Sequence, residues 1–137
     1  MTLSEKEKEA LISYRLEQAD EAVNDVELLI SNKRYRSAVN RIYYGMFYSL
    51  LAMGLAYNFE TSKHSQLIGW FNKTFISTSI IEKDYGRIIT KAYSRRTKGD
   101  YDIYVSFEKD LMVEMFAEMK KFISRIKEHL HQNLKLT

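Results

Sequence analysis

The sequence predicts an all-α protein: an up-and-down bundle of four long helices and one short helix, in a single domain spanning residues 1–137. Three observations support this fold class. The chain has no proline and only five glycines, so little interrupts its helices. Apolar residues recur at spacings of three and four, the period of a helical face. A chain of 137 residues, 45% of them hydrophobic, can bury one sizeable core.

The first helix is predicted from Ser4 to Ser31. Ser4 and Glu7 fit a capping box at its start. One apolar face then runs along the helix, formed by Ile12, Leu16, Ala19, Val23, Val26 and Ile30.

The second helix is predicted from Lys33 to Tyr57 and has two faces unsuited to water. One is an apolar stripe of Tyr35, Ala38, Val39, Ile42, Met46, Leu50 and Met53. The opposite side carries Arg41, Tyr44 and Tyr48. A helix of this kind either lies at the centre of a bundle or is shared with a second subunit.

The remaining helices are predicted from caps and periodicity. Thr61 or Ser62 is expected to cap the short third helix. Ser79 and Glu82 fit a second capping box, which would start the fourth helix, and Gly99 would end it in a left-handed conformation. The last helix is expected to begin near Ser106, and its tail, residues 131–137, to fray.

Composition excludes several classes of protein. Without cysteine, neither a disulfide framework nor a thiolate metal site is expected. No apolar run is long enough to span a membrane and the N-terminus has no secretory signal, so we expect a cytoplasmic protein without a membrane segment. One Glu-x-x-His pair, Glu128 and His131, is too little for a di-iron bundle, and no glycine-rich phosphate loop is present. We therefore expect no metal and no cofactor.

Arg96 is the unusual residue of the fourth helix, because it falls on the same arc as that helix's apolar residues, Ile81, Tyr85, Ile88, Ile89 and Ala92. A buried guanidinium needs a carboxylate, and Asp100 and Asp102 are the candidates. Arg96 either clamps the following loop or is held in place to bind a phosphate, and the two roles are compatible.

A separate cationic row runs along this helix, formed by Lys83, Arg87, Lys91 and Arg95. It is either a solvated face or a strip facing phosphates. A net charge of +3 does not by itself indicate a nucleic-acid-binding protein.

The segment RIYY in the second helix is another candidate constellation. Tyr43 faces the apolar stripe and is expected in the core. Arg41 and Tyr44 lie on the other side, where they either pack at a dimer seam or line a nucleotide cleft.

Three stretches in order, RSAVNRIYYGMFYSLLAMGL, TSKHSQLIGWFNKTFI and RRTKGDYD, resemble the HEPN domain, in particular its small stand-alone prokaryotic members. The resemblance covers nearly the whole chain. It implies a helical bundle that forms homodimers, has a minimal nucleotidyltransferase as partner, and belongs to a toxin–antitoxin or related pair acting on a nucleotide or RNA.

Active members of that family are metal-independent ribonucleases with an arginine followed, after four to six residues, by a histidine. The resemblance assigns Arg96 as the arginine, but Tyr101, Asp102 and Ile103 occupy the positions of the histidine. Neither tyrosine nor aspartate readily replaces imidazole in moving a proton at neutral pH. We therefore expect little or no ribonuclease activity from this motif.

Three hypotheses follow for function. The first is a dimeric module that binds a nucleotide, an RNA end or a transferase, with a ligand site made of Arg96, Asp100, Tyr101, Asp102, Arg41 and Tyr44. The second is a divergent ribonuclease in which Arg96 acts with His64, brought from another helix, or with the aspartates. The third is a protein-interaction module whose ligand site is vestigial. The resemblance further implies Tyr101 and Tyr104 as candidates for adenylylation by the partner enzyme.

Overall fold

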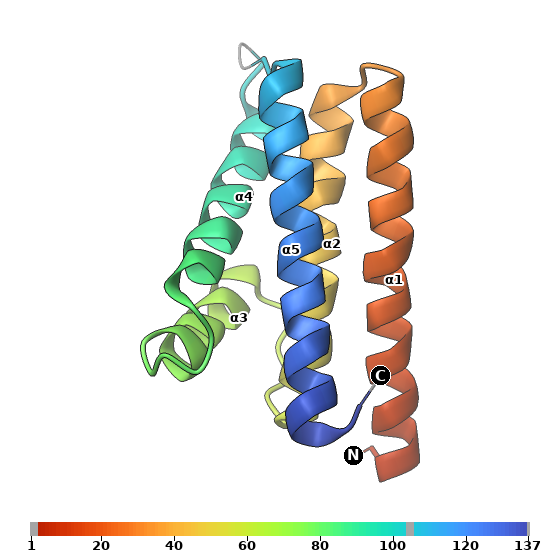
Figure 1. Cartoon of the computed structure of the whole chain (residues 1–137), viewed down its shortest axis with the longest axis vertical. Helices are drawn as coiled ribbons and strands as arrows, with labels where there is room; N and C mark the ends of the chain where they lie inside the picture. Colours follow the sequence, from red (N-terminus) through yellow and green to blue (C-terminus); the bar gives the residue numbers. More distant parts are fainter. Residues whose placement is uncertain (1–2, 104–105, 137) are drawn as a thin grey trace.

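Helices make up the whole fold in the computed structural model, which describes residues 3–103 and 106–136. They are α1 (Glu5–Ser31), α2 (Tyr35–Ala56), α3 (His64–Phe71), the π-helix η1 (Asn72–Ile76), α4 (Lys83–Tyr101) and α5 (Lys109–Leu134). Figure 1 shows α1, α2 and α5 running side by side, with α4 tilted against them and α3 near the start of α4. No strand occurs in the described ranges, and the predicted all-α bundle of four long helices and one short one is confirmed.

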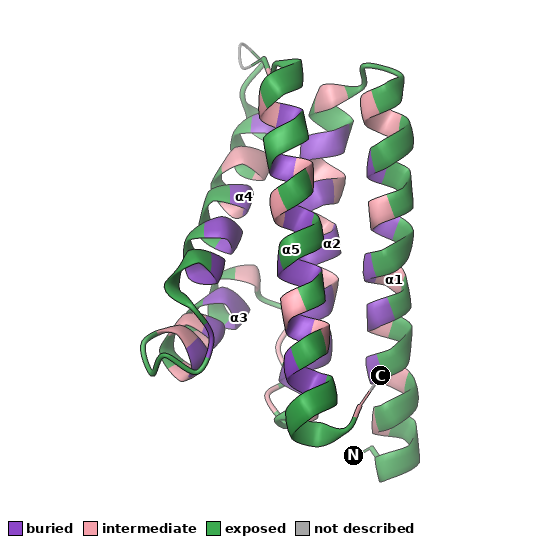
Figure 2. Cartoon of the chain, viewed as in Figure 1, coloured by how far each residue is buried: buried purple, intermediate pink, exposed green. Residues whose placement is uncertain are grey.

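Helix α2 is the central element, because it contacts α1, α3, α4 and α5. Its inner residues are fully or almost fully buried, as Figure 2 shows for the bundle as a whole. Gly45 permits close helix packing: a Cβ there would overlap Met119 of α5 and lie 3.1 Å from Ala22 of α1. The opposite face, with Tyr44 and Tyr48, is only half-buried. The expected two-faced helix is therefore present.

The first capping box is confirmed. The Ser4 hydroxyl accepts the Glu7 N–H at 3.1 Å, and the Glu7 carboxylate accepts the Ser4 N–H at 2.9 Å. Two N–H groups at the start of α1 that have no partner within the helix are satisfied in this way.

The second capping box, predicted for Ser79 and Glu82, is wrong. Ser79 lies in a turn with a φ of 62°, and α4 begins at Lys83 with Glu82 as its N-cap. The fully buried Ile81 draws the chain into the core before the helix can start. The Glu82 carboxylate is instead bound to Arg125, whose Nε donates to it at 2.8 Å.

The predicted left-handed stop at Gly99 is also wrong. Helix α4 continues to Tyr101, and no glycine in the described ranges has a positive φ. Gly99 is needed for its size, since a Cβ there would lie only 3.3 Å from the ring of Phe107. As a consequence, Asp100 lies one helical turn after Arg96 and not across a bend.

Other boundaries differ by a few residues. The N-cap of α3 is Lys63, not Thr61 or Ser62. Helix α5 begins at Lys109 rather than near Ser106, and it stays helical through Leu134, so the predicted fraying from residue 131 is wrong for those positions. Among the described residues, no helix is both long enough and apolar enough to cross a bilayer.

Candidate functional site

Arg96 lies on the inner side of α4, close to α2, with 17% of its side chain exposed. Its Nε is 2.9 Å from Asp100 Oδ2, an ion pair that is not a well-aligned hydrogen bond. One terminal nitrogen donates to the Tyr44 hydroxyl at 2.9 Å, and the guanidinium carbon lies 5.2 Å from the centre of the Tyr44 ring. These contacts fix the orientation of the guanidinium before any ligand arrives.

Tyr44 is flanked by a second arginine, Arg41, which precedes it on α2. The Arg41 guanidinium carbon lies 5.4 Å from the Tyr44 ring, and a terminal nitrogen donates to the Tyr48 hydroxyl at 3.1 Å. The Nε of Arg41 is buried and makes no hydrogen bond with any described residue. Two cations beside one ring create a positive potential that an anion would lower.

A pocket of about 380 Å³ lies between α2 and the last turns of α4. Its lining residues are Arg36, Ser37, Asn40, Arg41, Gly99 and Asp100. The Asn40 amide donates to both Asp100 oxygens at 3.3 Å. Arg36 donates to the Gly99 carbonyl and, at 3.2 Å, to the Asp102 carbonyl. The pocket therefore presents two guanidinium groups, an amide and a hydroxyl, and its one carboxylate is already paired with Arg96.

His64, the first residue of α3, is tied to the same cluster through Tyr43. The Tyr43 hydroxyl lies 2.6 Å from His64 Nδ1, and the His64 ring stacks on Phe47 with 4.1 Å between ring centres. The Arg96 guanidinium carbon is in turn 5.9 Å from the Tyr43 ring. Folding thus places a histidine of α3 next to the tyrosine ring that Arg96 approaches.

Burial and charge set the protonation of this pair. Burial lowers the pKa of His64, and the nearby positive charge of Arg96 lowers it further. Burial, opposed in part by Arg96, raises the pKa of Tyr43 far above its ordinary value. At neutral pH the pair is therefore a neutral imidazole and a neutral phenol.

The predicted site residues fall into two groups. Arg41, Tyr44, Arg96 and Asp100 come together, as described above. Tyr101 is 76% exposed, while Asp102 is exposed and offers its backbone carbonyl to Arg36. Tyr104 lies outside the described residues.

Three pocket residues of α2, Arg36, Ser37 and Asn40, were not predicted from sequence. Arg36 and Asn40 belong to a row on α2 in which every fourth residue is polar or aromatic: Arg36, Asn40, Tyr44 and Tyr48. This spacing places them on one face, so the signal was present. Within the described ranges, no group of three or more His, Asp or Glu side chains is arranged to hold a metal ion.

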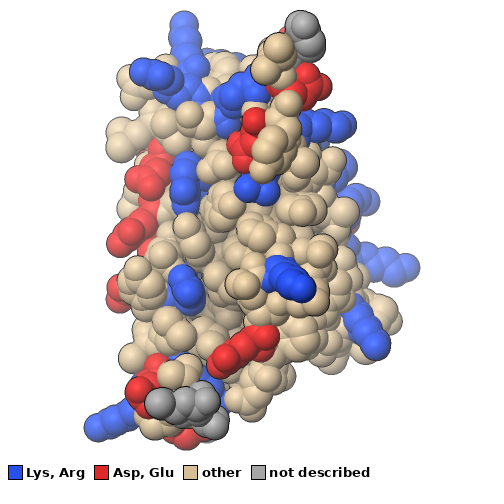
Figure 3. Space-filling view, turned by 180° about the vertical axis from the view of Figure 1, so that it is seen from behind, with Lys and Arg blue, Asp and Glu red and all other residues tan. Residues whose placement is uncertain are grey.

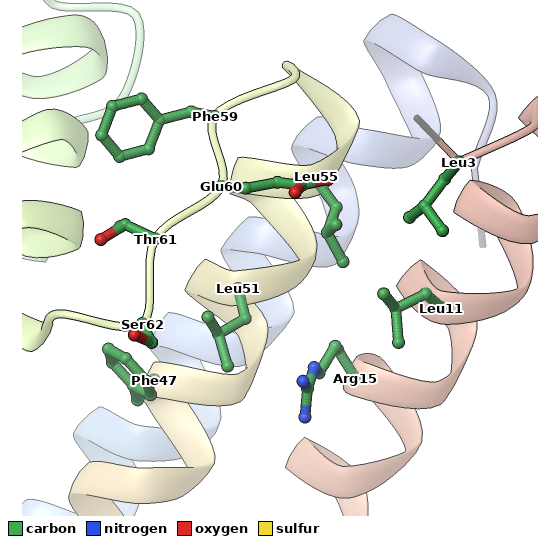
Figure 4. Close-up of a pocket in the computed structure, with 10 residues that line it drawn as sticks. All are labelled: Leu3, Leu11, Arg15, Phe47, Leu51, Leu55, Phe59, Glu60, Thr61 and Ser62. Atoms are coloured by element: carbon green, nitrogen blue, oxygen red, sulfur yellow. The ribbon is translucent and has the colours of Figure 1, made fainter. Parts of the chain in front are cut away.

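A larger groove of about 540 Å³ lies toward the other end of α2 and has a different character. Figure 4 shows Leu3 and Leu11 on one side of it and Leu51 and Leu55 of α2 on the other, with Arg15 and Glu60 among the residues around it. Its remaining lining residues are Phe47, Phe59, Thr61 and Ser62. The largely apolar lining suits packing against an apolar surface better than binding of phosphate.

Comparison with known proteins identifies the class to which this helical bundle belongs. The HEPN domain model matches residues 12–129, and the chain belongs to the HEPN domain family. The resemblance drawn from the three sequence stretches is thus confirmed.

Three relatives align with this chain over most of their length. A UPF0332 protein of Thermotoga maritima is 37% identical over 94% of this chain and 97% of its own. A Methanocaldococcus jannaschii protein, named as a putative toxin, is 37% identical over 90% of this chain and 91% of its own. A second protein of that organism with the same description is 31% identical over 84% of this chain and 78% of its own.

Proposed function

We propose that this HEPN protein is a toxin-type module that binds the phosphate of a nucleotide or an RNA end beside Arg96, without efficient RNA cleavage. The observation that carries the proposal is the Tyr44 ring with the guanidinium groups of both Arg96 and Arg41 close to it, next to a polar pocket. Arginine binds phosphate through paired N–H donors, and aromatic rings stack on bases. The relatives named as toxins support the biological class.

Weak cleavage is proposed because no histidine follows Arg96 at the positions that the ribonuclease motif uses. The residues there are Tyr101, Asp102 and Ile103. Tyr101 and Ile103 are both largely exposed and face solvent. A group that moves protons would have to come from elsewhere in the fold.

Binding of a nucleoside monophosphate to wild type, Arg96→Ala and Arg95→Ala tests this proposal by calorimetry. Arg95 is the matched control, because it is the neighbouring arginine and lies 3.9 Å from Glu118 of α5. We expect Arg96→Ala to weaken binding roughly 10- to 100-fold, the loss of one or two charge-assisted hydrogen bonds. Arg95→Ala should bind like wild type. Equal affinity in all three proteins would refute the proposal.

A second function, metal-independent RNA cleavage, is favoured by one observation: the Tyr43–His64 hydrogen bond beside Arg96. If His64 Nδ1–H donates to the Tyr43 oxygen, Nε2 keeps its lone pair and can accept a proton from the attacking hydroxyl. Arg96 would then stabilise the charge that develops on the phosphate.

Incubation of purified protein with single-stranded RNA in EDTA distinguishes the two functions. The binding module predicts intact RNA. Cleavage by wild type that is abolished by His64→Ala and by Arg96→Ala would refute the binding module and support the ribonuclease function.

We further propose a homodimer formed through the half-buried face of α2 that carries Tyr44 and Tyr48. The apolar groove next to this face, with Leu51 and Leu55 in its lining, supports a packing surface. Light scattering should give a dimer for wild type and a monomer for Leu51→Glu. A monomeric wild type would contradict the assembly but leave phosphate binding untouched.

The proposed partner is a minimal nucleotidyltransferase, and Tyr101 is a candidate for modification because 76% of it is exposed. Co-expression with such an enzyme, followed by intact mass, should show added AMP on wild type. A Tyr101→Phe variant separates Tyr101 from Tyr104 as the acceptor. An unmodified wild type would contradict this part of the proposal.

A further inference from the structure

The outer face of α4 consists of cations and hydroxyl groups. Every exposed residue from Lys83 to Lys98 is lysine, arginine, threonine or serine, with Asp84 as the one exception. The face comprises Lys83, Arg87, Thr90, Lys91, Ser94, Thr97 and Lys98. Lysine, arginine, serine and threonine are the side chains that bind phosphate oxygens in complexes with nucleic acids.

Charge is distributed unevenly across the bundle. Helix α4 has six basic and two acidic residues, whereas α1 has eight acidic and three basic ones. Figure 3 shows basic side chains projecting along the α4 edge and acidic side chains gathered along the α1 edge. A polyanion would therefore be attracted to one side of the molecule and repelled by the other, although the net charge is only +3.

Three lysines of this face keep their charge unneutralised. Arg87 is paired with Asp84. Lys83, Lys91 and Lys98 have no carboxylate of a described residue within ion-pair distance. From Lys83 to Lys98 the helix advances roughly 22 Å, and cations recur along it about once per helical turn. A row of this length can follow several consecutive phosphates of an extended strand.

The same face lacks what other partners require. It has no exposed aromatic or aliphatic side chain between Lys83 and Lys98. Protein interfaces are anchored by such groups, and helices that lie on membranes bury them among the lipids. Sequence-independent contact with a sugar-phosphate backbone needs only charge and hydroxyl donors.

The end of this face is also adjacent in the chain to the pocket beside Arg96. Lys98 directly precedes Gly99, which lines that pocket together with Asp100. We infer that the outer face of α4 is a contact surface for the backbone of single-stranded RNA, whose end occupies the Arg96 pocket. This inference rests on the proposed function in that it takes RNA, not a lone nucleotide, as the ligand.

Fluorescence anisotropy of a labelled single-stranded RNA oligonucleotide, over a series of salt concentrations, tests the inference. One variant, called the ridge variant, replaces the three unpaired lysines of the outer face of α4 (the ridge lysines) and combines Lys83→Gln, Lys91→Gln and Lys98→Gln. The control variant combines Lys6→Gln, Lys120→Gln and Lys135→Gln, three exposed lysines on α1, on α5 and at the end of α5. Both variants lose the same charge, and circular dichroism verifies that both are folded.

The ridge variant should bind RNA at least tenfold more weakly at low salt. Its slope of log affinity against log salt should fall in magnitude by about 2, the value for three lost contacts with a single strand. The control should keep the wild-type slope, and all three proteins should bind a nucleoside monophosphate equally.

Two results would overturn the inference while leaving the proposed function intact. Either the ridge and control variants bind RNA alike, or wild type binds a polyglutamate peptide as tightly as RNA with the same dependence on the ridge lysines. If wild-type protein binds neither RNA nor the monophosphate, the proposed function is refuted, and with it the inference that the outer face of α4 contacts RNA.

Discussion

The structure contains two tyrosine–histidine hydrogen bonds of equal length, one beside Arg96 and the other at the C-terminal end of α2. Tyr43 Oη lies 2.6 Å from His64 Nδ1, and Tyr57 Oη lies 2.6 Å from His129 Nε2. An arginine lowers the histidine pKa in both regions, Arg96 in the first and Arg125 in the second, in addition to the larger effect of burial.

The surroundings of the two histidines differ. His129 is 4% exposed, and its second nitrogen is occupied by the Asn133 amide at 3.2 Å. His64 is half-buried, and its Nε2 makes no hydrogen bond with a described residue. The comparison shows that a tyrosine–histidine hydrogen bond alone does not indicate a ligand-binding or catalytic site. The pair at His64 differs because it keeps one nitrogen for a ligand, and because its arginine, Arg96, is paired with a residue that lines a polar pocket.

The largest expected difference between the two regions is in stability. His129→Ala should lower the free energy of unfolding by about 2–4 kcal/mol, because it opens a cavity in the core and leaves the Tyr57 hydroxyl without its partner. His64→Ala, at a half-buried position, should cost less, about 1–2 kcal/mol, mainly because it leaves the Tyr43 hydroxyl without its partner. Urea denaturation of both variants measures the two losses. Equal losses would show that His64 is also a core residue.

Removing the tyrosine hydroxyls should also destabilise the His129 region more than the His64 region, with smaller losses in the free energy of unfolding. Tyr57→Phe leaves a buried nitrogen of His129 without a partner and should cost about 1–2 kcal/mol. Tyr43→Phe should cost less, because His64 is less buried than His129 and its unpaired nitrogen therefore carries a smaller desolvation penalty. A larger loss from Tyr43→Phe would contradict the distinction.

Acid should destabilise the protein, with the smallest effect of the three. Both histidines have a lowered pKa in the folded state, so the unfolded chain binds protons that the folded chain does not. Their contribution to stability is complete above their ordinary pKa of about 6.5 and decreases as the pH falls below it.

Denaturation at pH 7.5, 6.5 and 5.5, a series that brackets the ordinary histidine pKa of about 6.5, tests this expectation. His129→Gln removes one of the two titrating groups and should flatten the decrease seen with wild type. An unchanged slope in that variant would mean that His129 is protonated equally in both states.

Periodicity predicted the helices well, but contacts between helices decided their ends. Burial of Ile81 and the approach of Phe107 to Gly99 overrode the local signals for the start and end of α4. Neither contact can be read from neighbouring residues. Local rules succeeded where a single helix determines the outcome, as with Ser4 and Glu7.

The candidate site shows the same division. Asp100 stands four residues after Arg96, so helical spacing alone allows their ion pair. The contact between Tyr43 and His64 depends on the angle between α2 and α3, which the sequence does not specify. Arg36 and Asn40 lay on the same face as Tyr44, and only the approach of α4 shows that this face lines a pocket.

The most direct test is a titration with a nucleoside monophosphate, observed through the ring C–H resonances of the histidines by NMR. Binding beside Arg96 should shift the resonances of His64 and leave those of His129 unchanged, and Arg96→Ala should require a roughly 10- to 100-fold higher nucleotide concentration for the same shift. Resonances of His64 that stay still at saturating nucleotide, or that move no more than those of His129, would contradict a phosphate site at Arg96.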